Sequence, residues 1–582
     1  MNINGNIYIS NLESKISDKN SSPDTKHKEI VNETTSEKSV DHGGTLNPNI
    51  QILADTYAQE LIRSKKDYTP IHVDEMTSRL AKFYEKIRKV IDWKDDNAIR
   101  RGSIERILKR VLFPKLAGFL IKNYDPETLA ETITIELIRG GHLPNHTIPR
   151  ERLGGVSEAL YKYLYFFEHV SNDRSFKVKE KTNLATFILE IAACEIEEIL
   201  TNPVKEQEIT KAMTNILNDR ISIIPSDSLN SDEKLKIIRI SAQRTLYDLD
   251  DNFIIYQLLK EEYPDWHNPS PDRIGEMSKK IPDWWKNAYK KINTRINGKF
   301  DSVSEGVDTV FMLLDDVLEE LKDKPNKIRS TLENKEKLTD LITKSYNKRY
   351  KTLKIRLLHL AFFSTLSVFL SNWVTFYIIE VPLAHLFYEG FNLSAAIIDF
   401  LIPTLVMFFL VIIIKPPKKE NLKKIISTTL SFVYKDGGQE HYQIRIAGKR
   451  FRLFNVFMTL LFILSAWLVF TSIAFVFYVA KLPITSVIFD TFTIALTVFA
   501  AVVIRNQSKE LSVDEDRNFS DFVLDILTLP IAKVGSVLAK KWREYNIVAI
   551  FFNFVIETPF VAVLDFIQGW SEYLKERRSE MH

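Results

Sequence analysis

Two stretches near the C-terminal end decide the fold class: residues 357–379 (LLHLAFFSTLSVFLSNWVTFYII) and 453–480 (LFNVFMTLLFILSAWLVFTSIAFVFYVA). Neither contains Asp, Glu, Lys or Arg, and each is long enough to cross the hydrocarbon core of a membrane as a helix. A second apolar stretch follows each of them, at 393–414 and 482–504, and holds a single carboxylate. The sequence therefore predicts a four-helix transmembrane region.

The two pairs of apolar stretches resemble one another and predict two repeated hairpins, 357–414 and 453–504. The matched residue numbers differ by 96 at the start of the pairs and by 90 at their end, as expected if the second copy has shorter connections. Similar charges at the ends of any two spans would produce part of this match. The matched positions are Arg356 with Arg452, Ser371 and Trp373 with Ser465 and Trp467, Asp399 with Asp490, and Lys415 with Arg505.

Composition separates this region from the rest of the 582 residues. Long apolar runs fall after residue 357, whereas the first 350 residues are polar and charged. The net charge of +3 gives no indication of a nucleic-acid partner. A single cysteine, Cys194, excludes a disulfide within the chain, and its apolar surroundings predict a buried core residue. Residues 1–49 are rich in Asn, Ser, Asp, Glu, Lys and Thr and predict a disordered tail.

Between these regions, residues 51–300 have helical periodicity almost throughout, interrupted by Pro and Gly clusters. This pattern predicts a cytoplasmic bundle of about ten helices. Residues 301–356 then predict a helical stalk that leads into the first span, with an ordinary amphipathic core helix as the alternative. The apolar residues behind the stalk prediction are spaced by four and three: Val303, Val307, Val310, Leu314, Val317 and Leu321.

The distribution of Lys and Arg predicts the orientation. Residues 415–452 hold ten Lys and Arg, whereas residues 380–392 hold none. By the positive-inside rule, the bundle, the basic loop 415–452 and both termini face the cytoplasm. We therefore expect a multi-pass protein of a bacterial inner (plasma) membrane.

Two further elements are predicted on the cytoplasmic side. In the basic loop, residues 431–446 (SFVYKDGGQEHYQIRI) alternate on both sides of a Gly pair, which predicts a small β-hairpin. Residues 505–582 predict amphipathic helices lying on the membrane surface, because only residues 545–556 run without charge. Anionic lipid headgroups are the expected ligands of basic residues in both regions: Lys449, Arg450, Arg452, Lys540, Lys541 and Arg543.

The two carboxylates within the predicted spans, Asp399 and Asp490, are the candidate ion or proton sites. A carboxylate at that depth is costly unless it is paired, protonated or hydrated. If the two carboxylates face one another, they can share a proton or a cation. Alternatively, each caps a helix or accepts a hydrogen bond from a neighbour such as Ser486 or Thr493, which makes its role structural.

Other motifs give weaker signals. His142 and His146 are four apart, but Pro144 breaks the helical geometry that a shared metal needs. The acidic run 248–251 lacks the glycine and glutamate of a calcium loop and predicts a solvated helix face. The Pro-Asp-Trp sequences at 264–266 and 282–284 predict helix starts with buried Trp, or else an aromatic ligand pocket. The sequence thus indicates no catalytic residue, metal or cofactor.

Three functions remain compatible with the sequence. The leading hypothesis is a non-enzymatic scaffold or interaction module, in which the cytoplasmic domain binds a protein partner and the spans hold it at the lipid bilayer. The second is a small-ion or solute transporter that uses Asp399 and Asp490. The third is a membrane-associated enzyme of lipid or envelope metabolism, which depends on location alone.

Overall fold

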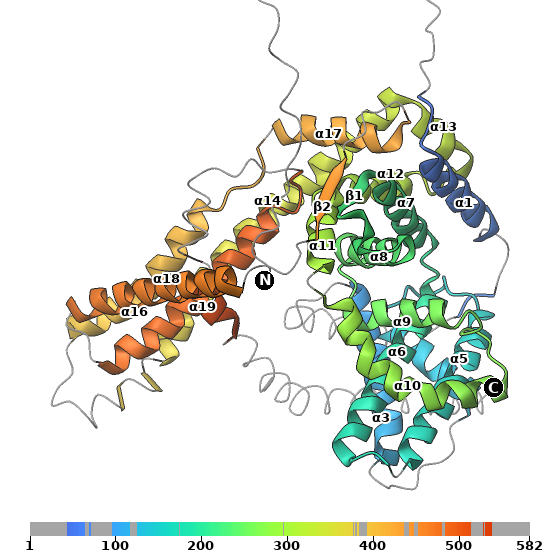
Figure 1. The fold of residues 1–582 in the computed structure, drawn as a ribbon, viewed down its shortest axis with the longest axis horizontal. Helices are drawn as coiled ribbons and strands as arrows, with labels where there is room; N and C mark the ends of the chain where they lie inside the picture. The colour runs from blue at the N-terminus through green and yellow to red at the C-terminus, as the bar shows by residue number, and fades with distance from the viewer. Residues whose placement is uncertain are drawn as a thin grey trace, which may run out of the picture. The chain divides into compact units, whose positions relative to one another are not determined.

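The computed structural model is predominantly helical, which confirms the all-α class (Figure 1). By the contacts between residues, the chain divides into unit 1, Met1–Thr339 with Thr429–Ile446, and unit 2, Asp340–Thr428 with Ala447–His582. The residues that the structure describes are 44–64, 69–71, 96–116, 125–173, 175–294, 296–375, 377–378, 381–382, 393–418, 420–435, 441–446, 452–479, 484–513, 528 and 530–537. The predicted tail 1–49 lies almost wholly outside them.

Unit 1 is a helical bundle, as predicted. Several of its helices begin where a side chain accepts a backbone N–H, which satisfies a donor that the first turn leaves unpaired; the residues are Asp125, Asn230, Asp250 and Ser270. The helices are α1 (Pro48–Ser64), α3 (Asp96–Leu116), α4 (Pro126–Arg139), α5 (Arg152–Asn172), α6 (Val178–Thr201), α7 (Val204–Arg220), α8 (Ser231–Tyr247), α9 (Asp251–Glu262), α10 (Pro271–Ile292), α11 (Asn297–Glu305), α12 (Asp308–Glu320) and α13 (Ile328–Glu333).

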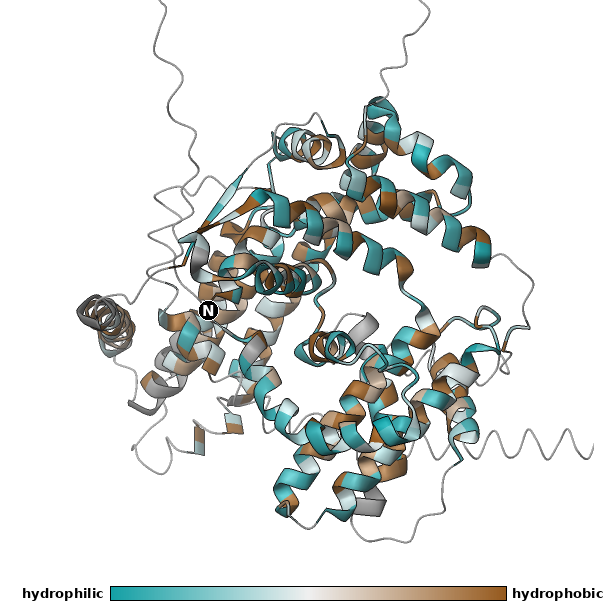
Figure 2. Ribbon diagram, turned by 45° about the vertical axis from the view of Figure 1, so that its right-hand side comes forward, coloured by the Kyte–Doolittle hydropathy of each residue, from teal (hydrophilic) through white to brown (hydrophobic). Residues whose placement is uncertain are grey.

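The largest core of unit 1 surrounds α6. This helix packs against α3, α5, α9 and α10, and side chains around its whole circumference are buried. Hydrophobic and hydrophilic residues are interspersed along the helices of the chain, as Figure 2 shows. Cys194 lies in this core and is buried, which confirms the prediction for it.

The helices α11 and α12 pack with α8, and α12 also packs with α7. Val303, Val310 and Leu314, three of the residues that predicted a stalk, are buried in unit 1. These residues lie on two helices, α11 and α12, that pack inside unit 1, as the alternative of an amphipathic core element expects. The next long helix, α14 (Lys335–Thr375), does run without a break into the predicted first span.

The predicted β-hairpin is wrong. Strand β2 (Tyr442–Arg445) pairs in parallel with β1 (Ile221–Ile224), with Ile221 opposite Tyr442. Residues 431–433, the expected first strand, instead end helix α17 (Glu420–Val433). The physical reason is that Ile425, Thr429 and Phe432 also recur at helical spacing and all three are buried.

Hydrogen bonds and an aromatic contact hold the segment 429–446 within unit 1. The Tyr434 hydroxyl donates to the Leu332 carbonyl at 2.6 Å. The Phe432 ring lies edge-on to Phe311, with 5.7 Å between centroids, and under the Arg220 guanidinium at 3.8 Å. Part of the region predicted as one basic loop therefore belongs to the core of unit 1.

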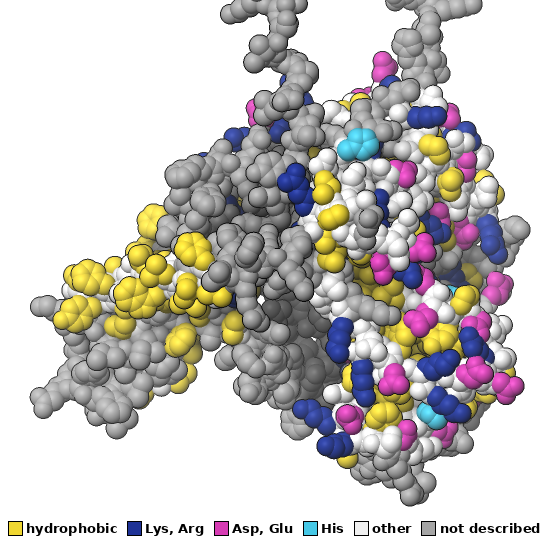
Figure 3. All heavy atoms as spheres, in the orientation of Figure 1, with side chains coloured by type: hydrophobic (Ala, Val, Ile, Leu, Met, Phe, Trp, Pro, Cys, Tyr) yellow, Lys and Arg dark blue, Asp and Glu magenta, His cyan; other side chains and the backbone are white. Residues whose placement is uncertain are grey.

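Unit 2 contains the apolar helices. Besides most of α14, these are α16 (Leu393–Ile413), α18 (Arg452–Val479) and α19 (Ile484–Ser508), which match the four predicted spans in position. Within the described part of the chain, two helices are long and apolar enough to cross a membrane, Lys335–Val374 and Asp490–Ser508. In Figure 3, hydrophobic side chains gather over helices of unit 2, whereas charged groups are scattered over unit 1.

Residues 530–537, within the region predicted to lie on the membrane surface, form a helix that packs against α19. Ile531 and Ala532 are buried in a cluster with Ile494, Ala495 and Val498. Gly535 permits this close approach, because a Cβ at this position would lie 2.2 Å from the Ala495 carbonyl oxygen. The rest of 514–582, apart from residue 528, lies outside the described residues.

Candidate functional site

The two intramembrane candidates occupy equivalent positions in their helices. Asp399 and Asp490 each come six residues after the first residue of their helix, Leu393 of α16 and Ile484 of α19. The two helices pack against each other. Asp490 is buried, with 5% of its surface exposed, while the side chain of Asp399 is outside the described part. Whether the two carboxylates face one another stays a prediction.

The six basic residues predicted to bind lipid headgroups also stay predictions. Arg452 is the first residue of α18, but its side chain is not described. Lys449, Arg450, Lys540, Lys541 and Arg543 lie outside the described residues.

The two histidines of the 140–148 loop are not brought together around a metal site. His142 Nε2 lies 2.8 Å from the Ser103 hydroxyl, and His146 is exposed with a positive φ of 64°. Among the described residues, no group of three His, Cys, Asp or Glu side chains is placed to hold a metal ion.

The acidic run 248–251 is the turn between α8 and α9, so the predicted solvated helix face is wrong. Asp248 has a left-handed backbone at the end of α8. Asp250 accepts the Phe253 N–H as the cap of α9 and pairs with Arg101 at 3.1 Å. Asp251 pairs with Arg244 at 2.8 Å. Short acidic side chains are favoured here because the same carboxylate can cap a helix and accept a hydrogen bond from Arg.

Neither Pro-Asp-Trp sequence starts a helix, which corrects the first of the two expectations for them. Pro264 follows the end of α9, and Trp266 is buried in the turn that comes next. Pro282 lies inside α10, which begins at Pro271. The Pro at the true start of α10 occupies the position where a missing N–H costs nothing.

The turn containing Trp266 covers a buried ion pair that joins α5 to α6. Lys162 Nζ lies 2.9 and 2.8 Å from the two carboxylate oxygens of Glu195, and both side chains are 1% exposed. The ammonium also donates to the Trp266 carbonyl at 2.6 Å and lies 4.7 Å from the centroid of its ring.

Glu195 accepts further hydrogen bonds. The Tyr163 hydroxyl donates to Oε2 at 2.7 Å and the Trp266 indole N–H at 3.0 Å, while His267 Nδ1 lies 3.2 Å from Oε1. Burial by itself raises the pKa of Glu195, but the bonds from His267, Lys162 and Tyr163 outweigh it and lower the pKa. A carboxylate with this many donors is a structural anchor, because its lone pairs are already occupied.

A second buried pair involves Glu197, two residues further along α6. Arg101 donates to Glu197 at 2.9 Å and to Asp250 at 3.1 Å, so that α3, α6 and the start of α9 are joined. Arg100 donates to the other oxygen of Glu197 at 3.0 Å. These charges hold the bundle together rather than face an open cavity.

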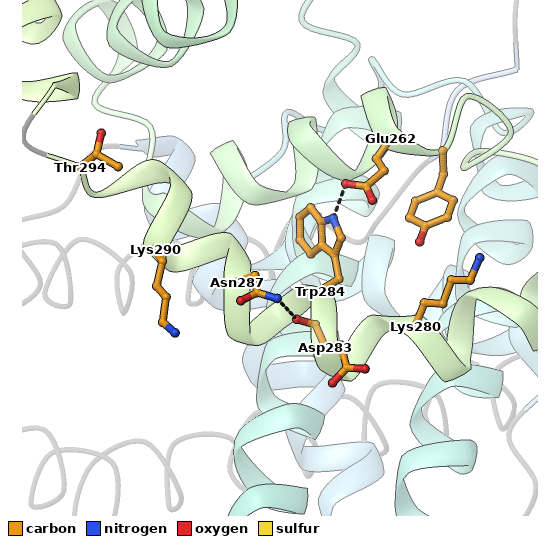
Figure 4. A pocket seen from close by; sticks show the side chains of 8 residues that line it. Glu262, Lys280, Asp283, Trp284, Asn287, Lys290 and Thr294 are labelled. Atoms are coloured by element: carbon orange, nitrogen blue, oxygen red, sulfur yellow. Dashed lines mark hydrogen bonds between the residues drawn. The ribbon is translucent and has the colours of Figure 1, made fainter. Parts of the chain in front are cut away.

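An open groove of about 600 Å³ lies along α10 (Figure 4). Glu262 and Tyr263 come from the end of α9, and Lys280, Asp283, Trp284, Asn287 and Lys290 come from α10. The Trp284 indole N–H donates to Glu262 at 2.5 Å, which orients the ring toward α9. Lys280 and Lys290 lie on either side of Trp284 along the helix, as Figure 4 shows. The groove thus combines an aromatic ring with charges of both signs.

Sequence reasoning named Trp284 as a possible ligand-pocket residue but missed the groove and both buried pairs. A signal for the pair did exist, because Lys162 interrupts the apolar run ALYKYLYFF and Glu195 follows IAAC. A charge on an otherwise apolar helix face requires a partner. The identity of that partner depends on how α5 and α6 pack, which no local pattern contains.

The chain matches no protein-family model, no curated protein and no solved structure. Its function therefore has to be argued from its own residues.

Proposed function

We propose that this is a multi-pass membrane protein without enzymatic activity, whose unit 1 binds a protein partner while the helices of unit 2 hold it in the lipid bilayer. The proposal depends on the groove along α10 of unit 1. The buried ion pairs of the same unit, Lys162–Glu195 and Arg101–Glu197, join its helices to one another.

The membrane part is supported by exposed apolar surface. In the most apolar segment of α14, 11% of the residues are buried, and in the most apolar segment of α19, 39% are buried. A core helix of a soluble protein would be mostly buried, since its apolar face packs inside. Phe362 and Trp373 of α14 and Trp467 of α18 are more than half exposed. Such large exposed apolar surfaces fit contact with lipid.

The partner-binding part is supported by the composition of the groove. Trp and Tyr are enriched among residues that contribute most to protein interfaces, and flanking charges select the partner. Trp284 is held in place by Glu262, and its neighbour Trp285 packs against Phe187 of α6. A ring fixed in this way loses little conformational entropy when a partner binds.

Site-specific photo-crosslinking in the full-length protein tests this proposal. A crosslinker at Asn287, inside the groove, should give one major product, and Trp284→Ala should abolish it. The matched control is Lys279, an exposed position on α10 that does not line the groove; the same crosslinker there should give little of that product. Equal products at both positions would contradict a specific site.

The topology has its own test. In the Cys194→Ala background, a cysteine placed at Glu389 should react with an impermeant reagent from outside the cell. A cysteine at Gly438 should react only after permeabilisation, because the Lys and Arg distribution favours a cytoplasmic location. The opposite pattern would invert the predicted orientation.

Transport of a small ion or solute is the second candidate, favoured by the burial of Asp490 in an apolar helix. Asp490→Asn should then abolish ion-dependent flux in proteoliposomes while protein abundance stays unchanged. Flux that is absent from the parent protein would remove this candidate and leave the interaction module.

A further inference from the structure

One face of α19 carries a line of polar side chains. Asp490, Thr493 and Thr497 follow at three and four residues, which places them on the same side of the helix. The line extends about 10 Å along the axis at a helical rise of about 1.5 Å per residue. Asp490 and Thr497 are 5% and 1% exposed, so the line faces the packed interior of unit 2.

The hydroxyl of Thr497 has not formed the bond that a threonine in a helix usually makes. On the same helix, the Thr491 hydroxyl donates to the carbonyl four residues earlier, that of Val487, at 2.6 Å. Thr497 Oγ1 is buried, and none of the residues that the structure describes forms a hydrogen bond with it. A buried hydroxyl without a partner costs free energy, and a water or proton carrier beside it would remove that cost.

The polar line ends at Thr497. Ala501 and Ile504, one and two turns further on the same face, are buried and apolar. The line of polar residues therefore runs from Asp490 to the middle of α19 and stops there. This arrangement suits a carboxyl group that takes up and releases a cation from one side of the membrane. The polar residues of this line do not continue along the full length of α19.

We propose that Asp490 is a proton-exchanging carboxyl group and that Thr493 and Thr497 continue a water-mediated track from it into unit 2. On uptake, a proton from water binds a carboxylate oxygen and leaves a neutral carboxyl group; release reverses this step. The proposal rests on the membrane placement of α19 in the proposed function, but it does not depend on the partner-binding groove. The neutral form is the one that an apolar helix tolerates best.

Carbodiimide labelling of the full-length protein in proteoliposomes tests the proposal, because dicyclohexylcarbodiimide reacts with protonated carboxyl groups in apolar surroundings. Peptide mass spectrometry should find the adduct on Asp490, increasing as the pH falls, and Asp490→Asn should remove it. Thr497→Val should give several-fold more label at neutral pH, because the ionised carboxylate loses a hydrated neighbour. Thr491→Val is the matched control and should label like the parent, since its hydroxyl is already bonded within the helix.

Three results would overturn the proposal. The first is no adduct on Asp490 at any pH in protein that resists alkaline carbonate extraction. The second is protection by sodium or lithium ions, which would make the site a metal-cation site rather than a proton site. The third is an equal effect of Thr491→Val and Thr497→Val, which would remove the track. Release of the protein by carbonate would overturn the membrane proposal as well, whereas crosslinking at Asn287 is independent of all three.

Discussion

Glu195 of unit 1 and Thr497 of unit 2 are both buried polar side chains, but their hydrogen bonding differs. In unit 1, Glu195 is surrounded by Lys162, Tyr163 and Trp266, each within hydrogen-bond distance. In unit 2, Thr497 lies buried on an apolar helix and has no such bond to any residue in the described ranges. Because a fully bonded group has no capacity left for a ligand, the difference separates charges that hold a fold together from groups that are available for exchange.

The largest expected effect is the loss of the Lys162–Glu195 pair. Glu195→Gln leaves the Lys162 ammonium buried without its counter-charge, and we expect a loss of about 3–5 kcal/mol in the free energy of unfolding. Denaturant titration of the full-length protein, followed by tryptophan fluorescence and by hydrogen exchange in α5 and α6, measures it.

Two variants show whether the effect belongs to the pair. Lys162→Met combined with Glu195→Gln removes both charges and keeps an acceptor for Tyr163 and Trp266, so it should recover at least half of the loss. Lys322→Met breaks the exposed pair with Glu319 and should change stability by less than about 1 kcal/mol. A double variant as unstable as Glu195→Gln would mean that packing, not charge, sets the cost.

The next effect tests how tightly unit 2 is packed. Gly535→Val places a side chain against the Ala495 carbonyl and Phe499, and we expect a loss of about 1–3 kcal/mol from overpacking. Hydrogen exchange should increase around residue 495 of α19 and stay unchanged in α6.

Gly154 provides the contrasting glycine. It lies in α5 of unit 1, where, among the described residues, an added Cβ would meet nothing within 4 Å beyond its chain neighbours and the adjacent backbone of α5. Gly154→Ala should therefore stabilise the helix by about 0.5–1 kcal/mol. If Gly535→Val were as harmless as Gly154→Ala, the helix at 530–537 would not pack on α19 as the structure has it.

The sequence was sufficient for elements with long periodic patterns. The four apolar helices of unit 2 and the helical bundle were predicted from hydrophobic period and composition. The hairpin failed because residues 431–433 fit alternation and helical spacing equally, and the true partner of β2 lies at Ile221–Ile224, more than two hundred residues earlier. Short segments carry too little local information to select a distant partner.

The candidate sites also differ in how much of them local sequence contains. Asp490 was named as a candidate ion or proton site because a single carboxylate in an apolar run is visible in sequence, and its role stays a prediction. The Lys162–Glu195 pair and the α10 groove depend on contacts between helices, so no local pattern contains them. The spacing behind the stalk prediction does not decide between its two alternatives, since Val310 and Leu314 have a coiled-coil spacing that also suits a core helix.

The last expected effect distinguishes two carboxylates on α6 of unit 1 by the sign of their pH dependence. Burial is the main cause that raises the pKa of Glu190 from 4.5 to about 7, with Glu105 adding to it. The folded state therefore binds more protons than the unfolded state between about pH 4.5 and 7, and Glu190 weakens folding progressively as the pH rises through this range. For Glu195 the pKa is lowered, so its contribution to stability is present above the unfolded pKa and is lost as the pH falls.

Glu190→Gln removes the group that ionises unfavourably. We expect it to stabilise the protein by roughly 1–2 kcal/mol at pH 8 and to have almost no effect at pH 4, where the carboxyl group is mostly neutral in both states. Glu195→Gln should show the opposite trend, with its largest loss at pH 8 and a smaller one in acid. Thermal unfolding of both variants and the parent at pH 4, 6 and 8 gives the comparison. Parallel pH profiles for the two variants would mean that the hydrogen bonds around Glu195 do not stabilise its charge.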